Sequence, residues 1–421
     1  MKSTGIIGGG ASGMMAAIAA ASTGEQVTIL ERQDRVGKKL LATGNGRCNL
    51  SNLDFCVERD YRSRSDSGQI SACFDRFGVK DTLSFFEKRG LHTTEKNGYL
   101  YPRSLQAAAV LDFFRGELDR LRVRVVCSCT VKTIRKREKF FVVTDQGEFC
   151  FDRLILACGS AAGTIARAKL GGFLLARDLG LSVCEPFPAL TALRCQEKFM
   201  KQLAGVRCMA RVTLRIYPAK TEGFSKPGQM RRPESTYTEE GELQLTDTCI
   251  SGIPVFQFSR YAVDALGHGR QVEALIDFLP EYTQQAWEDV CRAQYENCLG
   301  KSVLLLGSGL LHKKVVCVLL SCCGLLPDEI VGRKTRDRIF GMYSLMRAFP
   351  VHIVGHHSME HAQVCAGGVA LWEVDSHMES QKIPDLFLCG EMLDVDGRCG
   401  GYNLQWAWSS GYLAGSRGRN R

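Results

Sequence analysis

The sequence lacks several patterns that would each indicate a particular class of protein. No two of its 19 cysteines stand at CxxC spacing, which argues against a zinc ribbon and against a dithiol redox centre. The longest later apolar run, residues 315–326, is shorter than the ~20 residues that a membrane-spanning helix needs. There is also no internal repeat and no low-complexity tract, so we expect a folded globular chain.

The composition fits that expectation. The chain has 421 residues, 45% of them hydrophobic and 24% charged, and 54 basic against 45 acidic residues give a net charge of +9. This length suffices for two or three packed domains. An odd number of cysteines in a long chain is typical of a reducing compartment, so we expect a cytoplasmic protein. The apolar run 5–21 superficially resembles a signal peptide, but it contains four glycines, and secretion is the less favoured alternative.

A glycine-rich turn follows the first expected strand, residues 4–7, and opens the expected helix 12–21. Its pattern is Gly8-x-Gly10-x-x-Gly13. In this context Gly8 permits a tight turn, Gly10 lets a pyrophosphate approach the backbone, and Gly13 allows close packing of the helix. The unpaired amides and the dipole at the helix start then favour phosphate. The turn predicts a dinucleotide site, with a merely structural tight turn as the alternative.

The second expected strand, residues 27–30, ends in Glu31. A carboxylate at this position can accept hydrogen bonds from both hydroxyls of an adenosine ribose and would repel a phosphorylated ribose. The alternative is a solvated glutamate. The two features together predict half of a βαβ unit but do not distinguish NAD from FAD.

A second glycine-rich segment near the C-terminus distinguishes between the two cofactors. An expected strand, residues 385–389, precedes Gly390-Glu391, and Gly400-Gly401 precedes an expected helix, 404–413. An acid here can bind ribityl hydroxyls, and a helix start can stabilise negative charge on a reduced flavin. A simple nicotinamide domain needs no such tail. The alternative is a glycine-rich cap on a packing helix, with Trp406 and Trp408 in the core.

Two segments resemble a known family. Residues 43–52, TGNGRCNLSN, and residues 390–411, GEMLDVDGRCGGYNLQWAWSSG, are similar to the YhiN/BaiN-type flavoproteins, also called the aminoacetone oxidase family of FAD-binding enzymes. Segments 241–247, 250–254 and 362–369 share the resemblance, which therefore covers nearly the whole chain. It implies an NAD(P)/FAD-dependent oxidoreductase with FAD as cofactor.

The resemblance also implies the architecture. The fold class is α/β, a two-dinucleotide-binding-type FAD domain with a Rossmann-like parallel sheet and a β-meander, interrupted by a β-barrel-like and helical insert. The change of pattern along the chain places the discontinuous FAD domain at 1–190 and 350–421. The insert is expected at 191–349, β-rich over 191–275 and helical over 276–340, covering the substrate side.

The motifs and the resemblance together predict the residues that bind FAD. They comprise the first glycine turn, the ribose acid and its neighbours, the loop after Gly37, and the C-terminal motif: Gly8, Gly10, Ala11, Ser12, Gly13, Glu31, Arg32, Lys38, Lys39, Gly44, Gly46, Arg47, Val131, Gly159, Gly390, Glu391, Asp394, Gly400, Gly401, Asn403, Leu404 and Gln405. Two departures stand out. Segment 160–172 lacks the Gly-Ser/Thr-x-Gly-Asp-Gly pattern of relatives, and Ile253-Pro254 replaces Gly-Pro.

The catalytic candidates are Arg47, Cys48, Asn49 and Tyr402. Cys48 is the only cysteine between Gly37 and Asn52, so disulfide reduction is not expected. A nucleophilic or redox thiol is one interpretation, and packing beside the flavin is the favoured one.

The reaction itself stays open at this stage. Without a second GxGxxG, hydride would come from a transiently docked NAD(P)H, from the substrate, or from another donor. The resemblance admits amine oxidation and reduction of an activated double bond, as in bile-acid-processing relatives, because flavin N5 can accept or deliver hydride. A flavin-binding protein with a regulatory or RNA-associated, non-catalytic role is the alternative.

We expect a small-molecule substrate, no membrane and no metal. His356, His357 and His361 lack a carboxylate at HExxH spacing and are interpreted as solvated histidines. The basic segments 333–338 and 417–421 lack interleaved aromatic residues, so nucleic acid is not favoured. The sequence does not indicate the oligomeric state.

Overall fold

The computed structural model describes residues 2–65, 67–163, 171–219 and 232–416. The chain divides into two compact units, one comprising Met1–Pro188 with Met359–Arg421 and the other Ala189–Ser358. The second unit therefore starts two residues earlier and ends nine residues later than the expected insert, 191–349. Among the described residues, no helix combines the length and apolar character that a membrane span requires.

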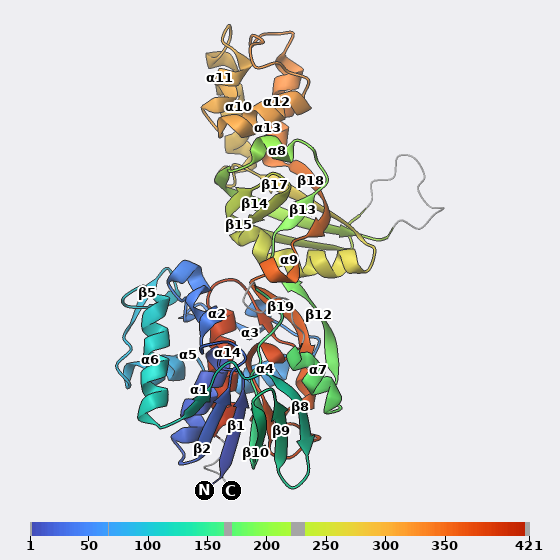
Figure 1. The fold of residues 1–421 in the computed structure, drawn as a ribbon. Coiled ribbons are helices and arrows are strands. Elements are labelled where there is room, and N and C mark those ends of the chain that lie inside the picture. Colours follow the sequence, from blue (N-terminus) through green and yellow to red (C-terminus); the bar gives the residue numbers. More distant parts are fainter. Residues whose placement is uncertain (1, 66, 164–170, 220–231, 417–421) are drawn as a thin grey trace. The chain divides into compact units, whose positions relative to one another are not determined.

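The first unit is built on a five-stranded parallel sheet with the order β20-β11-β1-β2-β7. Its strands β1 and β2 lie side by side in Figure 1. The strands are β1 (Ser3–Ile7), β2 (Gln26–Leu30), β7 (Arg124–Val126), β11 (Arg153–Leu156) and β20 (Leu386–Leu388). Every residue of β11 and β20 is buried, as expected of parallel strands covered on both faces. The sheet confirms the expected fold class.

Two helices from opposite ends of the chain pack together against this sheet. α1 spans Ala11–Ala21 and α14 spans Tyr402–Ser416. Gly411 and Gly415 of α14 let the backbones approach, because a Cβ at either position would overlap the carbonyl oxygens of Ser12 or Ala16. Residues 3–30 and 386–416 are thereby joined in one core.

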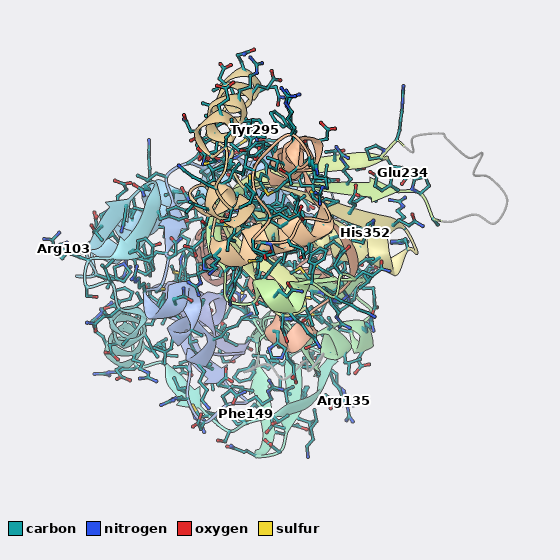
Figure 2. All side chains as sticks on the ribbon, turned by 90° about the horizontal axis from the view of Figure 1, so that it is seen from above. Arg103, Arg135, Phe149, Glu234, Tyr295 and His352 are labelled. Atoms are coloured by element: carbon teal, nitrogen blue, oxygen red, sulfur yellow. The ribbon has the colours of Figure 1, made fainter. Side chains whose placement is uncertain are left out.

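A three-stranded antiparallel meander lies on β1. Its strands are β8 (Val131–Lys136), β9 (Phe140–Thr144) and β10 (Gly147–Phe151). The Phe151 ring occupies the space that a side chain at Gly5 would need. Arg135 and Phe149 belong to this meander (Figure 2). β7, which precedes the meander in the chain, pairs in parallel with β2 and belongs to the main sheet.

Smaller elements complete the first unit. Three minor sheets contain β3 (Ser51–Asn52), β6 (Tyr99–Pro102) and β5 (Thr93–Lys96); β4 (Tyr61–Arg62) and β21 (Asp396–Gly397); and β12 (Val183–Ala189) and β19 (Val364–Val369). The remaining helices and 3-10 turns are α2 (Lys38–Leu41), η1 (Thr43–Gly46), α3 (Val57–Asp60), α4 (Ser67–Arg76), α5 (Val79–Glu87), α6 (Ala107–Arg120), α7 (Gly171–Asp178), η2 (Met359–His361), η3 (Leu371–Glu373) and η4 (Gly390–Met392).

A buried ion pair fixes the C-terminal end of α14. Arg153 of β11 pairs with Glu25 at 3.0 Å, and the two side chains are 3% and 9% exposed. The same guanidinium donates to the carbonyl oxygens of Ala414 and Gly415, where the helix dipole favours a cation. Arg153 therefore links the sheet to the end of the last helix.

The second unit contains a closed six-stranded barrel with the order β13-β16-β15-β14-β17-β18. Its strands are β13 (Leu193–Cys195), β14 (Arg207–Tyr217), β15 (Ser235–Leu245), β16 (Cys249–Gly252), β17 (Gln271–Asp277) and β18 (Phe349–His356). Buried residues alternate with less buried ones along β14 and β17, so one face of each strand forms the interior. All pairings between these strands are antiparallel.

One boundary of this unit differs from the expectation. β18, which carries His352 (Figure 2), was assigned to the FAD domain, but it pairs with β13 and β17 and closes the barrel. Helices α10 (Gln284–Asn297), α11 (Val303–Ser308), α12 (Lys313–Cys322) and α13 (Arg336–Arg347) precede it, while α8 (Met200–Leu203) and α9 (Ile253–Gly267) lie among the strands.

Candidate functional site

The three glycines of the first motif occupy three different environments. Gly8 has φ +107°, and a Cβ there would overlap the carbonyl oxygen of Ala157. A Cβ at Gly13 would overlap the carbonyl oxygen of Gly8. A Cβ at Gly10, in contrast, would have no described atom within 4 Å. Gly8 and Gly13 are thus required by the fold, whereas Gly10 faces open space in the described part of the chain.

The start of α1 offers backbone amides rather than side chains. Gly10 is its N-cap, and among the described residues no side chain caps this end and no acidic residue lies in its first turn. An uncapped helix start has unsatisfied N–H groups and a partial positive charge, which together bind phosphate. Ala11 and Ser12, predicted to bind the cofactor, lie in this turn.

Glu31 lies directly after β2, beside the glycine turn. Its Oε2 accepts a hydrogen bond from Gly9 N at 2.6 Å and its Oε1 accepts one from Gln33 N at 2.7 Å. Each carboxylate oxygen can accept a further bond, so a ribose can still be bound. The neighbouring Arg32 is exposed. Val131 lies close in sequence to Cys129, whose N–H donates to the Glu31 carbonyl oxygen at 2.9 Å.

The C-terminal motif meets the first one at Ser12. Gly390 has φ +70°, and a Cβ on it would overlap the Ser12 hydroxyl. Its N–H donates to Ser410 Oγ at 2.9 Å, and its carbonyl oxygen accepts from Trp406 Nε1 at 3.1 Å. The tryptophan-bearing helix therefore holds the Gly390 turn against the first turn of α1.

Glu391 projects into an ion-pair cluster. Its Oε2 lies 2.7 Å from Lys39 Nζ and accepts a hydrogen bond from Ser160 Oγ at 2.9 Å. The Glu391 side chain is 18% exposed. Lys38, the other predicted basic residue, instead pairs with Asp34. Ser160 adjoins Gly159, and most of the divergent segment after it, residues 164–170, lies outside the described residues.

Three other predicted cofactor ligands are engaged within the protein. Buried Asp394 accepts from the backbone amides of Arg64 and Gly367 at 3.0 and 3.1 Å. Asn403 bonds both backbone groups of Gly397. These side chains brace the motif, because each is already bonded to a loop that forms it.

Gln405 has the same bracing role. It is fully buried, accepts from Ser51 Oγ at 2.7 Å, and donates to Thr82 Oγ1 and Ser409 Oγ. Leu404 is half-buried beside it and packs against the core.

The loop that contains Gly44, Gly46 and Arg47 approaches the Gly400-Gly401 turn. Gly400 and Gly401 have φ +131° and +96°, and a Cβ at Gly401 would lie 2.8 Å from Asn49 Oδ1. That oxygen is buried and has no hydrogen-bond partner among the described residues. A buried acceptor of this kind is costly unless a ligand or water satisfies it. Arg47 is exposed.

Cys48 lies in the same loop but is not exposed. It is fully buried, and burial raises its pKa to about 12. The thiol is therefore neutral near pH 7, whereas a nucleophilic cysteine is a thiolate. This environment favours the packing interpretation.

The Tyr402 hydroxyl is already hydrogen-bonded within the protein. It donates to the Asp54 carbonyl oxygen at 2.7 Å, and burial raises its pKa to about 12. The structure adds Tyr99, which the sequence did not single out and whose ring lies against Gly400. Its signal in the sequence is faint, an alternation of aromatic and apolar residues in Tyr-Leu-Tyr-Pro.

The three histidines of the sequence analysis divide between the two units. His361 belongs to the first unit and His356 and His357 to the second. Nε2 of His357 lies 3.3 Å from Cys249 Sγ, and Nδ1 of His356 lies 2.8 Å from the His357 carbonyl oxygen. Across the described ranges, no three His, Cys, Asp or Glu side chains form a group that could hold a metal ion.

The chain is similar to one protein family and to several characterised proteins. The family model described as HI0933-like protein Rossmann domain matches residues 2–417. The 3-dehydro-bile acid delta(4,6)-reductase of Clostridium scindens is 37% identical over 425 residues, covering 100% of this chain and 100% of that protein. The ribosomal RNA dihydrouridine synthase of Haemophilus influenzae is 26% identical over 416 residues, covering 97% and 96%.

A solved structure shows a similar arrangement at low identity. The 3-ketosteroid-delta4-(5alpha)-dehydrogenase from Rhodococcus jostii RHA1 is 15% identical, with a TM-score of 0.48 over 98% of this chain and 95% of that one.

Proposed function

The chain belongs to the HI0933-like Rossmann-domain family of FAD-dependent oxidoreductases, and on that premise we propose that it reduces a carbon–carbon double bond conjugated to a carbonyl group in a small organic substrate. The observation that carries the proposal is the packing of the Gly390 turn onto Ser12. One elongated ligand can then contact the start of α1 and the start of α14. A dinucleotide with a flavin at its far end has this extended form.

The first motif supplies the adenosine and pyrophosphate end of the site. The open face of Gly10 and the uncapped amides of α1 suit the pyrophosphate. Glu31 suits the ribose hydroxyls through the acceptor capacity left on both oxygens. Lys39, with its Nζ on Glu391, lies where it can neutralise phosphate charge.

The C-terminal motif supplies the flavin end. Glu391 is the acid we assign to ribityl hydroxyls, because its side chain is 18% exposed whereas Asp394 is fully buried. Gly400, Gly401 and the start of α14 form the positive end of a 15-residue helix, which favours negative charge on a reduced ring. The buried Asn49 Oδ1 offers an acceptor beside them. When bound, FAD supplies hydride transfer at N5.

The two kinds of relative support the class of substrate. A delta(4,6)-reductase and a dihydrouridine synthase both saturate a carbon–carbon double bond next to a carbonyl. The reductase shares 37% identity along both entire chains, against 26% for the RNA-modifying relative. We therefore favour a small carbonyl compound over RNA.

The cysteines bear on the electron donor by disfavouring a thiol-based one. Burial keeps the Cys48 thiol neutral, and no CxxC exists in the sequence, so a dithiol relay does not suit this site. A reduced nicotinamide that delivers hydride and leaves is the donor we propose.

An anaerobic titration tests the proposal. Purified protein is reconstituted with FAD, reduced with NADH or NADPH, and mixed in separate arms with a 3-oxo-4-ene steroid and with unmodified ribosomal RNA. We expect the flavin absorbance to bleach with nicotinamide and to return with the enone, together with saturated product. If RNA alone reoxidises the flavin, the substrate is uridine in RNA and not an enone. Bleaching without turnover in either arm would favour a non-catalytic flavin-binding role.

A further inference from the structure

Four tyrosines lie around the segment that ends in Gly400-Gly401, and the hydroxyls of two of them are hydrogen-bonded to backbone carbonyl groups. Tyr61 is 4% exposed and donates to the Tyr402 carbonyl oxygen at 2.9 Å, while Tyr402 is 6% exposed and donates to Asp54 O. Both side chains therefore hold buried backbone segments together. Neither hydroxyl is available to a substrate without breaking a buried hydrogen bond.

The other two tyrosines, Tyr99 and Tyr101, lie on one face of β6. Alternate residues of a strand point to opposite faces, and Leu100 and Pro102 are buried while the two tyrosines are half-buried. In the described part of the chain, neither hydroxyl has a recorded hydrogen bond. Both are therefore free to bond a ligand.

Tyr99 is the one that reaches the glycine turn. A Cβ at Gly400 would lie 2.9 Å from Tyr99 Cε1, and Asn52, which faces Tyr99 in the sheet, donates to Gly400 O at 3.2 Å. Tyr101 lies two residues further along the strand, about 6.6 Å away at ~3.3 Å per residue. Of the two tyrosines on this face of β6, Tyr99 is thus the one placed against Gly400.

The surroundings keep the Tyr99 phenol protonated. Burial raises its pKa above the usual value, with the nearby Cys399 adding to this effect and the Arg398 guanidinium opposing it. A neutral phenol is a hydrogen-bond donor and a general acid. The same arginine can stabilise a transient phenolate after proton transfer.

We propose that Tyr99 is the catalytic acid of the enone reduction, a role that rests on the proposed function. Hydride addition at the β-carbon, with its two electrons derived from a reduced nicotinamide, shifts the carbon–carbon π pair into an enolate. The O–H bond of Tyr99 then breaks, its proton forms the new C–H bond at the α-carbon, and the phenolate recovers a proton from water. Electrons and protons balance without any further reactant.

Two matched variants test this role. Tyr99→Phe and Tyr101→Phe remove the same hydroxyl from the same face of one strand. With the enone in D₂O, the wild-type enzyme and Y101F place deuterium on a single face of the α-carbon. We expect Y99F to lower kcat at least tenfold and to lose this facial selectivity, because water then delivers the deuteron from either side.

A binding measurement separates the acid from a packing role. A substituted phenol whose phenolate mimics the enolate is titrated into each variant, with and without FAD, and its ionisation is followed by absorbance. Losing one hydrogen bond to a charged acceptor should weaken phenolate binding in Y99F about tenfold or more, with Y101F at the wild-type value.

The outcomes distinguish this proposal from the proposed function. Absence of enone reduction by the wild-type enzyme would refute the proposed function. If the wild-type enzyme is active and Y99F keeps its kcat, facial selectivity and phenolate affinity, Tyr99 is not the acid. The same losses in Y101F instead of Y99F would overturn the assignment to Tyr99.

Discussion

Gly10→Val separates cofactor binding from folding better than any other change in the glycine motif. Gly10 has φ −81° and ψ −169°, which valine adopts readily, and the new Cβ has no described atom within 4 Å. Valine is a poor N-cap, so the free energy of unfolding should fall by only about 1 kcal/mol. Gly8→Val, in contrast, combines φ +107° with a clash against Ala157 O and should misfold.

The effect on FAD should be far larger than the effect on stability. The isopropyl group would stand between the pyrophosphate and the first amides of α1. Loss of two charge-assisted hydrogen bonds at about 1.5–3 kcal/mol each amounts to ~3–6 kcal/mol, which corresponds to a Kd at least about a hundredfold weaker.

The assay compares FAD content, FAD affinity and stability in one series. FAD released on denaturation gives the occupancy, calorimetry on the stripped protein gives Kd, and a thermal melt without FAD gives the stability. Gly116→Val is the control, since Gly116 is an exposed glycine of α6 that also has no described neighbour for a Cβ. Wild-type FAD affinity in G10V would refute the assignment of the pyrophosphate to α1, and a stripped G10V protein that fails to fold would contradict the open environment of Gly10.

Further predictions concern the thiol, the ribityl acid, the buried ion pair and acid stability. Cys48→Ser should retain FAD and turnover, and iodoacetamide should leave Cys48 unlabelled while it modifies exposed Cys56; loss of FAD would contradict a packing role. Glu391→Gln should weaken FAD binding about tenfold by calorimetry, and exposed Glu148→Gln should not. Arg153→Met should lower the free energy of unfolding in urea by about 3–5 kcal/mol, because it leaves Glu25 buried and unpaired, whereas exposed Arg135→Met should be nearly neutral. Lys139 and Ser3 lower the pKa of Asp152, so the contribution of its carboxylate to stability is present above about pH 4 and is lost as pH falls. In Asp152→Asn the urea concentration at the unfolding midpoint should therefore depend less on pH between about pH 4 and 2 than in the wild-type protein. An unchanged pH dependence would exclude Asp152 as a source of acid sensitivity.

Much of the dinucleotide fold could be predicted from the sequence because its signals are local. The strand, glycine turn and helix of residues 3–21 are contiguous. The surroundings of the three motif glycines agree with the motif, because Gly8 and Gly13 have no room for a side chain and Gly10 faces open space. The pairings of β18 could not be predicted in this way. It joins β13 across about 160 residues, and no short pattern records which of two domains a strand will complete.

The site was harder to predict than the fold because a polar residue in a motif can bind a ligand or brace the loop that does. Asp394, Asn403 and Gln405 read as ligands in the sequence, yet their bonds go to protein groups. Only three-dimensional contacts separate these roles. Lys39 and Glu391 form their pair over 352 positions, which a single sequence does not encode visibly.

The braced residues explain how the proposed flavin end of the site can be built from backbone groups. Gly400 and Gly401 hold left-handed conformations that other residues adopt at a cost of order 1–3 kcal/mol, and a Cβ at Gly401 would be 2.6 Å from Ser51 O. Asn403 and Gln405 fix the strands and the turn on both sides of this pair. Because these bonds form within the protein, the backbone groups facing the cofactor are ordered before it binds, and less of the binding free energy is lost to ordering the loop. Asn49 Oδ1 and the Tyr99 hydroxyl then remain beside this turn as polar groups with capacity for a ligand, and Glu391 keeps such capacity next to Lys39.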